Sequence, residues 1–170
     1  MAKKLFVVVA VLACTAVSVL AQSKPSIQGV WRAVEVTITN PAPNPGTNPK
    51  GTHTDLQPGL MIFTGKHYST MNDTAAKARP TGGFKVAAKP TAEEMQAQWG
   101  PFNANAGTYE LAGNILTRHV IVAKNPAAQG AKTFSKATIK LDGNNLWITT
   151  TETQGGKTEY PATVKYVRIE

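Results

Sequence analysis

The stretch ATIKLDGNNLWITT, residues 137–150, contains two alternating segments that flank the turn sequence Asp142-Gly143-Asn144-Asn145. Asp, Asn and Gly are the residues that tight hairpin turns favour. Pairing the two segments across this turn matches Leu141 with Leu146, Ile139 with Ile148 and Ala137 with Thr150. One face of the pair is then apolar, while Thr138, Lys140 and Trp147 share the opposite face. This alternation predicts an antiparallel hairpin with one buried side.

Similar short runs of Val, Ile, Thr, Tyr and Trp, bounded by Gly, Asn, Asp and Pro, occur along most of the chain. They predict an all-β protein. The predicted strands are 27–39, 60–64, 67–72, 108–112, 115–123, 133–141, 146–153 and 162–169. Eight successive antiparallel strands are the number that closes an up-and-down barrel around one small ligand. We therefore predict an eight-stranded up-and-down barrel, with a β-sandwich as the alternative.

The segments between the strands carry their own signals. Four prolines between Asn40 and Asp55 predict a long loop, and Gly65-Lys66 predicts a two-residue hairpin turn with Gly65 at positive φ. Thr91 and Glu94 have the spacing of a capping box, and Gly100-Pro101 follows as a stop signal. We expect one short helix between the third and fourth strands, packed onto the barrel as a lid or plug.

The first 21 residues have the organisation of a secretory signal peptide. Lys3 and Lys4 precede an apolar segment, residues 5–20, and Val19-Leu20-Ala21 places small residues at the cleavage site. We predict cleavage after Ala21 and a single barrel domain over residues 22–170, exported to the periplasm or secreted. The apolar segment is too short for a lasting transmembrane helix, so we expect no transmembrane segment in the mature chain.

A second interpretation of the same segment is a lipoprotein signal. Val11-Leu12-Ala13-Cys14 resembles a lipobox, which would leave a lipid on Cys14. Leu12 fits that motif poorly, and apolar residues continue to Leu20. We therefore favour ordinary cleavage after Ala21, which leaves the mature chain without cysteine and hence without disulfides.

Composition limits the classes of partner. The 170 residues include 18 basic and 10 acidic side chains, a net charge of +8, which loss of Lys3 and Lys4 lowers to +6. The bases are scattered singly, without the clusters that track a phosphate backbone, so we predict no nucleic-acid partner. The three histidines, His53, His67 and His119, lack the spacing of a ligand pair. We predict no metal and no other cofactor.

Several short motifs together resemble a known family. Gly29-Val30-Trp31 opens the first strand and Arg168 lies near the end of the last, as in lipocalins. The chain is more similar to the bacterial lipocalin-like domain family of calycin-type β-barrels, which shares five motifs with it in the same order. These are Gly29 to Arg32, Gly59 to Gly65, Arg79-Pro80, Gly107 to Tyr109 and the strand with His119. The resemblance covers nearly the whole mature chain, although Arg118 stands where the family pattern has a second histidine.

This resemblance implies a barrel closed at one end and a cavity for a small molecule. In lipocalins the tryptophan of the Gly-x-Trp motif closes the barrel floor and the late arginine packs over it. The positions in this chain are Gly29, Trp31 and Arg168. A cation over an indole contributes about 0.5 to 2 kcal/mol.

The candidate ligand-binding residues come from strands 108–112 and 115–123, paired across Gly113-Asn114. One face would carry Tyr109, Leu111, Leu116, Arg118, Val120 and Val122; the other would carry Glu110, Thr117, His119 and Ile121. If the first face lines the cavity, Arg118 is its lone cation and can bind a carboxylate or phosphate. If the second face does, Glu110 and His119 form an acid/base pair. The residues leave both alternatives open.

The leading prediction is an exported protein that binds a small apolar or amphipathic molecule, with an anionic group as one option, and does not transform it. The predicted ligand-binding residues are Arg118, His119, Tyr109, Tyr68 and Trp99. One alternative is a cavity enzyme of the isomerase, cyclase or hydrolase type that uses His119 and Glu110. The other is an envelope interaction protein whose barrel is packed solid and binds no ligand.

Overall fold

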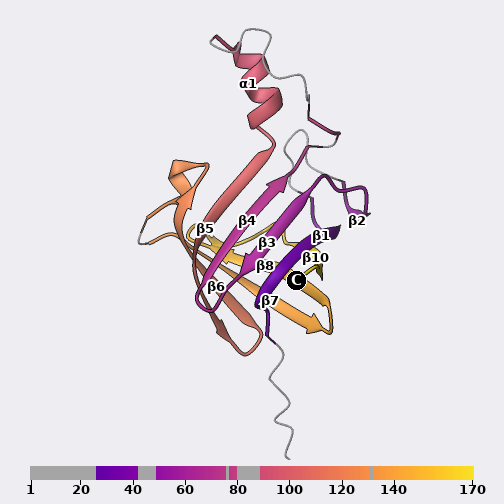
Figure 1. Ribbon diagram of the computed structural model, residues 1–170, viewed down its shortest axis with the longest axis vertical. Helices are drawn as coiled ribbons and strands as arrows, with labels where there is room; N and C mark the ends of the chain where they lie inside the picture. Colours follow the sequence, from indigo (N-terminus) through magenta and orange to yellow (C-terminus); the bar gives the residue numbers. More distant parts are fainter. Residues whose placement is uncertain (1–25, 42–48, 76, 80–88, 131) are drawn as a thin grey trace, which may run out of the picture.

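A computed structural model describes residues 26–41, 49–75, 77–79, 89–130 and 132–170 (Figure 1). The predicted signal peptide, its cleavage site and the lipobox-like segment lie outside the described residues. The helices and strands are β1 (Gly29–Ile38), β2 (Gly51–His53), β3 (Gly59–Phe63), β4 (His67–Asp73), α1 (Ala92–Trp99), β5 (Phe102–Ala112), β6 (Ile115–Ala123), the 3-10 helix η1 (Pro126–Ala128), β7 (Phe134–Asp142), β8 (Asn145–Thr153), β9 (Gly156–Lys157) and β10 (Ala162–Arg168).

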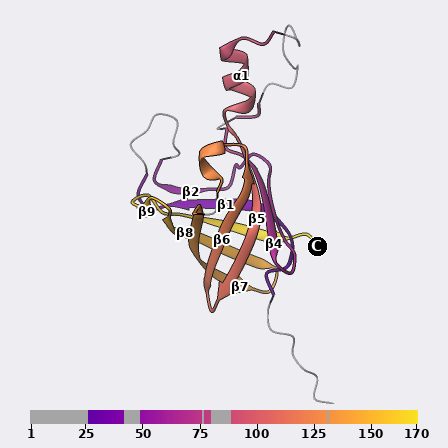
Figure 2. The ribbon, with the colours of Figure 1, turned by 90° about the vertical axis from the view of Figure 1, so that its left-hand side faces the viewer.

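The long strands form a closed barrel. The order along the sheet is β10-β1-β3-β4-β5-β6-β7-β8, and β10 also pairs with β8, which joins the two ends of the sheet. Every pairing is antiparallel. In Figure 2, β5 and β6 cross in front of β1 and β8 at a steep angle, as expected for tilted strands that wrap around a barrel. The predicted eight-stranded antiparallel barrel is confirmed.

The hairpin of β7 and β8 has the register that its sequence predicts. Leu141 pairs with Leu146, Ile139 with Ile148 and Ala137 with Thr150. Gly143 has a φ of 56°, a conformation that glycine adopts without steric cost. Ala137, Leu146 and Ile148 are buried in the barrel core. The alternation of apolar and polar residues therefore decides which face of this hairpin points inward.

One end of the barrel is closed by β1 and β10. Trp31 is completely buried, and its indole Nε1 donates a hydrogen bond to the carbonyl oxygen of Ile27 at 2.7 Å. The Arg168 guanidinium lies 4.2 Å from the centroid of the Trp31 ring and donates to the carbonyl oxygen of Ser26 at 2.7 Å. A Cβ atom on Gly29, whose φ is 132°, would lie 2.3 Å from the carbonyl oxygen of Glu170. Only glycine fits here, where the start of β1 passes close to Arg168 and Glu170.

Three details differ from the sequence predictions. Residues Gly51–His53, which lie in the predicted loop, form a short strand on β1, so α1 follows the fourth strand of the chain. The turn at Gly65-Lys66 forms, but Gly65 does not take a positive φ; the Thr64 hydroxyl instead bonds to the main chain of His67. β5 begins at Phe102 rather than Thr108, because pairing with β4 extends it through a segment of small and polar residues.

The helix forms but does not cover the barrel. Thr91 and Glu94 make both hydrogen bonds of a capping box, at 3.2 and 2.9 Å. None of the residues of α1 is buried, and the helix stands beyond one end of the barrel (Figures 1 and 2). The predicted lid or plug is therefore wrong, because Met95 and Trp99 alone give the helix too narrow an apolar face to pack. No helix among the described residues is long and apolar enough to cross a membrane.

Candidate ligand-binding cavity

The barrel interior changes character from its closed end to its open end. The closed half holds the largest fully buried side chains, namely Trp31, Phe63, Leu116 and Leu146. Thr70 of β4, which is aligned with Met61, is a buried polar residue of this core; it donates to the carbonyl oxygen of Leu60 at 3.3 Å and accepts from Asn72 at 3.1 Å. The closed half is thus a packed, mainly apolar core, whereas both polar and apolar residues line the open half.

Two cavities lie in the open half. The larger, about 540 Å³, is bordered by β1, β3, β4, β10 and the segment from His53 to Gln57, with Tyr166 among its lining residues. The smaller, about 380 Å³, is bordered by Tyr68, Asn105 and Arg118 together with η1 and the open ends of β7 and β8. Both volumes fall within the usual range of small-molecule sites. The barrel is therefore packed at one end and hollow at the other.

Arg118 points into the barrel. It pairs with Tyr109 in the β5–β6 ladder and lies on the same face of β6 as the buried Leu116. Its guanidinium carbon lies 5.5 Å from the centroid of the Tyr68 ring. The guanidinium forms no ion pair or hydrogen bond with the residues that the structure describes, and its Nε is buried without an acceptor. A buried donor without a partner is uncommon, because losing its water costs free energy.

Two buried tyrosines share the field of this cation. Burial raises the pKa of Tyr68 above 10.0, and the positive charge of Arg118 opposes the rise. Burial raises the pKa of Tyr166 in the same way, again against the charge of Arg118. The Tyr68 hydroxyl donates to Asn105 Oδ1 at 2.8 Å. Because Tyr68 lines the smaller cavity and Tyr166 the larger, the field of Arg118 extends to the walls of both.

Tyr109 faces inward but belongs to the closed half. Its hydroxyl donates to the carbonyl oxygen of Thr64 at 2.7 Å, and its ring meets Phe63 edge-on at 5.0 Å between centroids. It lines neither cavity. The structure therefore gives Tyr109 a packing role and places it away from the predicted ligand.

His119 and Glu110 lie on the outer face. They are neighbours of Arg118 and Tyr109 along their strands and so point the opposite way, and Glu110 is exposed. The acid/base alternative required this face to line the cavity, and it does not. Val122, expected inside, is 55% exposed, because a bulge between Ala106 and Gly107 shifts the register of the β5–β6 ladder.

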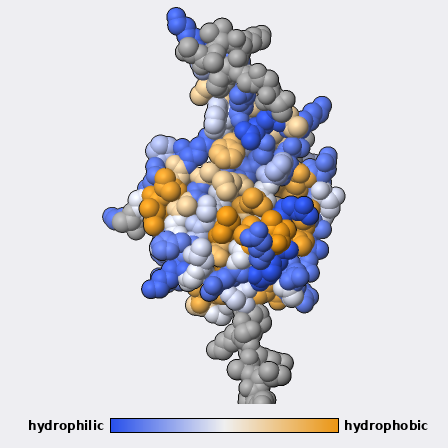
Figure 3. Space-filling model, viewed as in Figure 1, coloured by the Kyte–Doolittle hydropathy of each residue, from blue (hydrophilic) through white to orange (hydrophobic). Residues whose placement is uncertain are grey.

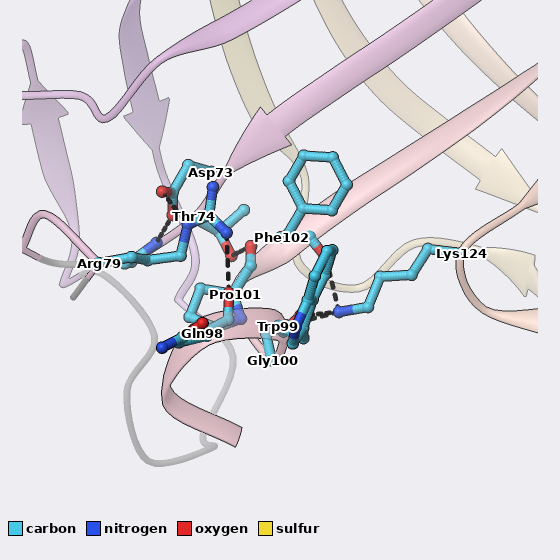
Figure 4. Close-up of polar contacts among 10 residues, drawn as sticks. Asp73, Thr74, Arg79, Gln98, Trp99, Gly100, Pro101, Phe102 and Lys124 are labelled. Atoms are coloured by element: carbon cyan, nitrogen blue, oxygen red, sulfur yellow. Dashed lines mark hydrogen bonds and ion pairs between the residues drawn. The ribbon is translucent and has the colours of Figure 1, made fainter. Parts of the chain in front are cut away.

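Trp99 lies outside the barrel, at the base of α1. It is 47% exposed, meets Phe102 edge-on at 6.2 Å and borders a shallow pocket of about 330 Å³ with Arg79. Its main-chain carbonyl accepts from Lys124 Nζ, which also donates to the carbonyl of Phe102 at 2.7 Å (Figure 4).

Arg79 binds the same helix end from another direction. It donates from Nη1 to the carbonyl of Gln98 at 2.8 Å, and its Nε lies 2.5 Å from Asp73 Oδ2 (Figure 4). Cations at a helix C-terminus are favourable because they face its partial negative charge. Arg79 and Lys124 therefore hold α1 at the rim of the barrel.

Two cavity residues, Tyr166 and Asn105, were not predicted from the sequence. Tyr166 could have been found, because it alternates with Arg168 on the last strand and Arg168 was expected to face Trp31. The sequence did not indicate that Asn105 lies in a strand, because the segment that begins β5 has low β-propensity. His53 borders the larger cavity, with Nε2 2.8 Å from the carbonyl oxygen of Pro49. Within the described residues, no cluster of His, Cys, Asp or Glu could hold a metal ion.

Comparison with known proteins does not assign the chain to a family. No protein-family model matches the chain. No curated protein matches it either. The structure itself shows a closed eight-stranded antiparallel barrel that is compatible with a calycin-like fold.

Proposed function

We propose that the open half of the barrel binds a small amphipathic molecule and does not transform it, with Arg118 holding an anionic group of that molecule. The observation that carries this proposal is the inward guanidinium of Arg118, whose Nε is buried and has no hydrogen-bond or ion-pair partner among the described residues. A buried donor without an acceptor costs about 1 to 3 kcal/mol. A carboxylate or phosphate that binds Nε and one terminal nitrogen together supplies the missing acceptor.

The apolar part of the ligand has a place in the smaller cavity, beside Arg118. Val120, Ala127 and Phe134 supply apolar wall there. Burial of ligand surface against such a wall contributes about 25 cal/mol per Å². Because the closed half is already packed, the ligand occupies only the open half, where polar groups accompany the apolar ones. This mixture favours an amphipathic molecule over a purely apolar one.

The same proposal includes export of the protein. The signal-peptide pattern of residues 1–21 supports a location in the periplasm or outside the cell. Neither alternative function gains support from the site. A cavity enzyme that uses His119 and Glu110 needs these residues inside the barrel, and a ligand-free interaction protein needs a filled interior.

A matched pair of probes tests the proposal. We expect the chain from residue 22 to bind dodecanoate more tightly than dodecanol in titration calorimetry, because only the carboxylate pairs with Arg118. Arg118→Gln should weaken dodecanoate binding by about tenfold, or about 1.4 kcal/mol, and leave dodecanol binding unchanged. Arg32→Gln, which removes an exposed arginine of β1, is the control and should change neither.

Two results would contradict the proposal. One is equal affinity of the unaltered protein for acid and alcohol. The other is an Arg118→Gln variant that folds, as judged by its far-ultraviolet circular dichroism, and still prefers the acid. Native mass spectrometry of gently purified protein, compared with its denatured mass, complements the titration because a discrete adduct reveals the molecule bound in the cell.

A further inference from the structure

The outer wall of β7, β8 and β10 carries two lysines on one indole. Lys140 of β7 and Lys165 of β10 are the cross-strand neighbours of Trp147 on β8. Their ammonium nitrogens lie 5.1 and 5.4 Å from the centroid of the Trp147 ring. These contacts place two like charges around one indole on the surface, each attracted by the electrons of the same aromatic ring.

The charges of these two lysines are not ion-paired within the described structure. Within the part of the chain that the structure describes, Lys140 and Lys165 form no ion pair. Glu35 is the cross-strand neighbour of Lys165 on β1, but its carboxylate does not form an ion pair with the Lys165 ammonium. The nearby Lys136 differs, because its ammonium lies 3.1 Å from Glu152 Oε2. Each of the two ammonium groups is therefore available to pair with an anionic group of a partner.

A row of threonine hydroxyls runs beside this pair of cations. The register aligns Thr138, Thr149, Thr163, Thr37 and Thr52 across five adjacent strands. Thr149 and Thr163 are joined by a hydrogen bond of 2.7 Å, and Thr37 and Thr52 by one of 3.0 Å. Each hydroxyl has one donor and two acceptor positions, so these bonds leave capacity for an external partner. Neighbouring strands are about 4.8 Å apart, which makes the row a regular ladder.

The chemistry of this wall favours one class of anionic partner. A membrane surface would favour a cluster of exposed apolar side chains next to the lysines, but the exposed apolar strand residues Met71, Leu111, Ile121 and Val122 belong to β4, β5 and β6. Only Tyr160 and Ile169 flank β10 among the exposed large apolar residues that the structure describes. On the face shown in Figure 3, apolar surface gathers over β1, β3 and β4 instead. Nucleic acid favours arginines and several aromatic platforms, whereas the cations here are lysines on a single indole. A partner rich in both anionic groups and hydroxyls fits the lysines and the threonine row together.

We propose that this wall, made by Lys140, Trp147, Lys165 and the threonine row, binds a linear anionic polysaccharide. Its carboxylate or sulfate groups pair with the two ammonium groups, and its hydroxyls bond with the threonines. The strands run side by side, so a polymer that crosses β7, β8 and β10 contacts both features at once. This surface lies on the outside of the barrel and is separate from the cavity that holds Arg118.

Binding measurements with defined polymers test the inference. Immobilised protein from residue 22 is titrated with polygalacturonate, dextran sulfate and neutral dextran. We expect both anionic polymers to bind, with affinity that falls as salt rises, and neutral dextran not to bind. Lys140→Gln with Lys165→Gln should weaken binding by about tenfold, because two charged contacts are lost. The control, Lys66→Gln with Lys77→Gln, removes the same charge from exposed positions elsewhere and should change affinity less than about twofold.

Other outcomes overturn the inference. Equal loss of affinity in the two double variants would mean that net charge alone attracts the polymer. Binding to phosphatidylglycerol vesicles or to oligothymidylate with no binding to either polysaccharide would assign the wall to a different partner. In an NMR titration, the amides of Thr149 and Thr163 should shift with added polygalacturonate. Arg118→Gln should leave that titration unchanged, which separates this surface from the cavity.

Discussion

At the scale of single residues, the interior of the open half depends on one cation and two aromatic hydroxyls. Arg118 lies near Tyr68, and its charge reaches Tyr166, which is only 4% exposed. A tyrosine buried in this way resists ionisation, because a phenolate would lose most of its hydration. The pKa of each of these hydroxyls is raised by burial even though Arg118 favours the anion.

These raised pKa values predict a loss of stability in alkali. Below pH 10 both tyrosines are neutral in the folded and unfolded chains, so they contribute no pH dependence there. Above about pH 10 the unfolded chain releases their protons first, and the free energy of unfolding falls as the pH rises. Urea unfolding of the unaltered protein and of Tyr166→Phe between pH 8 and 11 measures the effect. The variant should lose less stability over this range, whereas Tyr160→Phe, at an exposed position, should follow the unaltered protein.

At the scale of elements, α1 is an appendage of the barrel. It buries none of its residues and is held by its capping box at one end and by Arg79 and Lys124 at the other. Isolated helices of this length are unstable in water, so these end contacts supply much of what keeps it folded. Its sequence signals are local, which explains why the start and stop of the helix were predictable while its placement was not.

Removal of the capping threonine should therefore loosen α1 and nothing else. Thr91→Ala removes a hydrogen bond that contributes about 1 kcal/mol, so amide exchange in residues 92–99 should accelerate by about fivefold. The amides of β7 and β8 serve as the internal reference and should exchange at unchanged rates. A lowered melting temperature of the whole domain would show that α1 is part of the core after all.

At the scale of the whole molecule, stability and binding are divided between the two halves of the barrel. The closed half contains Trp31, Phe63, Leu116 and Leu146, which are contributed by β1, β3, β6 and β8 and pack into one core. The open half has two cavities with both polar and apolar lining residues. Substitutions of ligand-binding residues in the open half should therefore leave the packing of the closed half unchanged.

A pair of substitutions on one strand tests this division. Leu116→Ala should lower the free energy of unfolding by about 2–5 kcal/mol, because it leaves a cavity in the packed half. Ile121→Ala lies on the same strand at a position 63% exposed, and we expect a change below about 0.5 kcal/mol. Urea unfolding followed by tryptophan fluorescence measures both. Similar losses for the two variants would place the core elsewhere.

The sequence by itself determined the eight long strands except the first part of β5, most turns and the inward face of the β7–β8 hairpin, because alternation and turn chemistry are local properties of the chain. The sequence also predicted that Tyr109 and Arg118 are cross-strand neighbours, because only Gly113-Asn114 separates their strands. Tertiary structure alone decided that Arg118 points inward and His119 outward, because that choice depends on which face the closed barrel covers. Tertiary structure also decided the register shift between β5 and β6 at Gly107, where a Cβ atom would lie 1.8 Å from the carbonyl oxygen of His119. It likewise decided that the open half is hollow. Both features depend on how strands distant in the sequence meet.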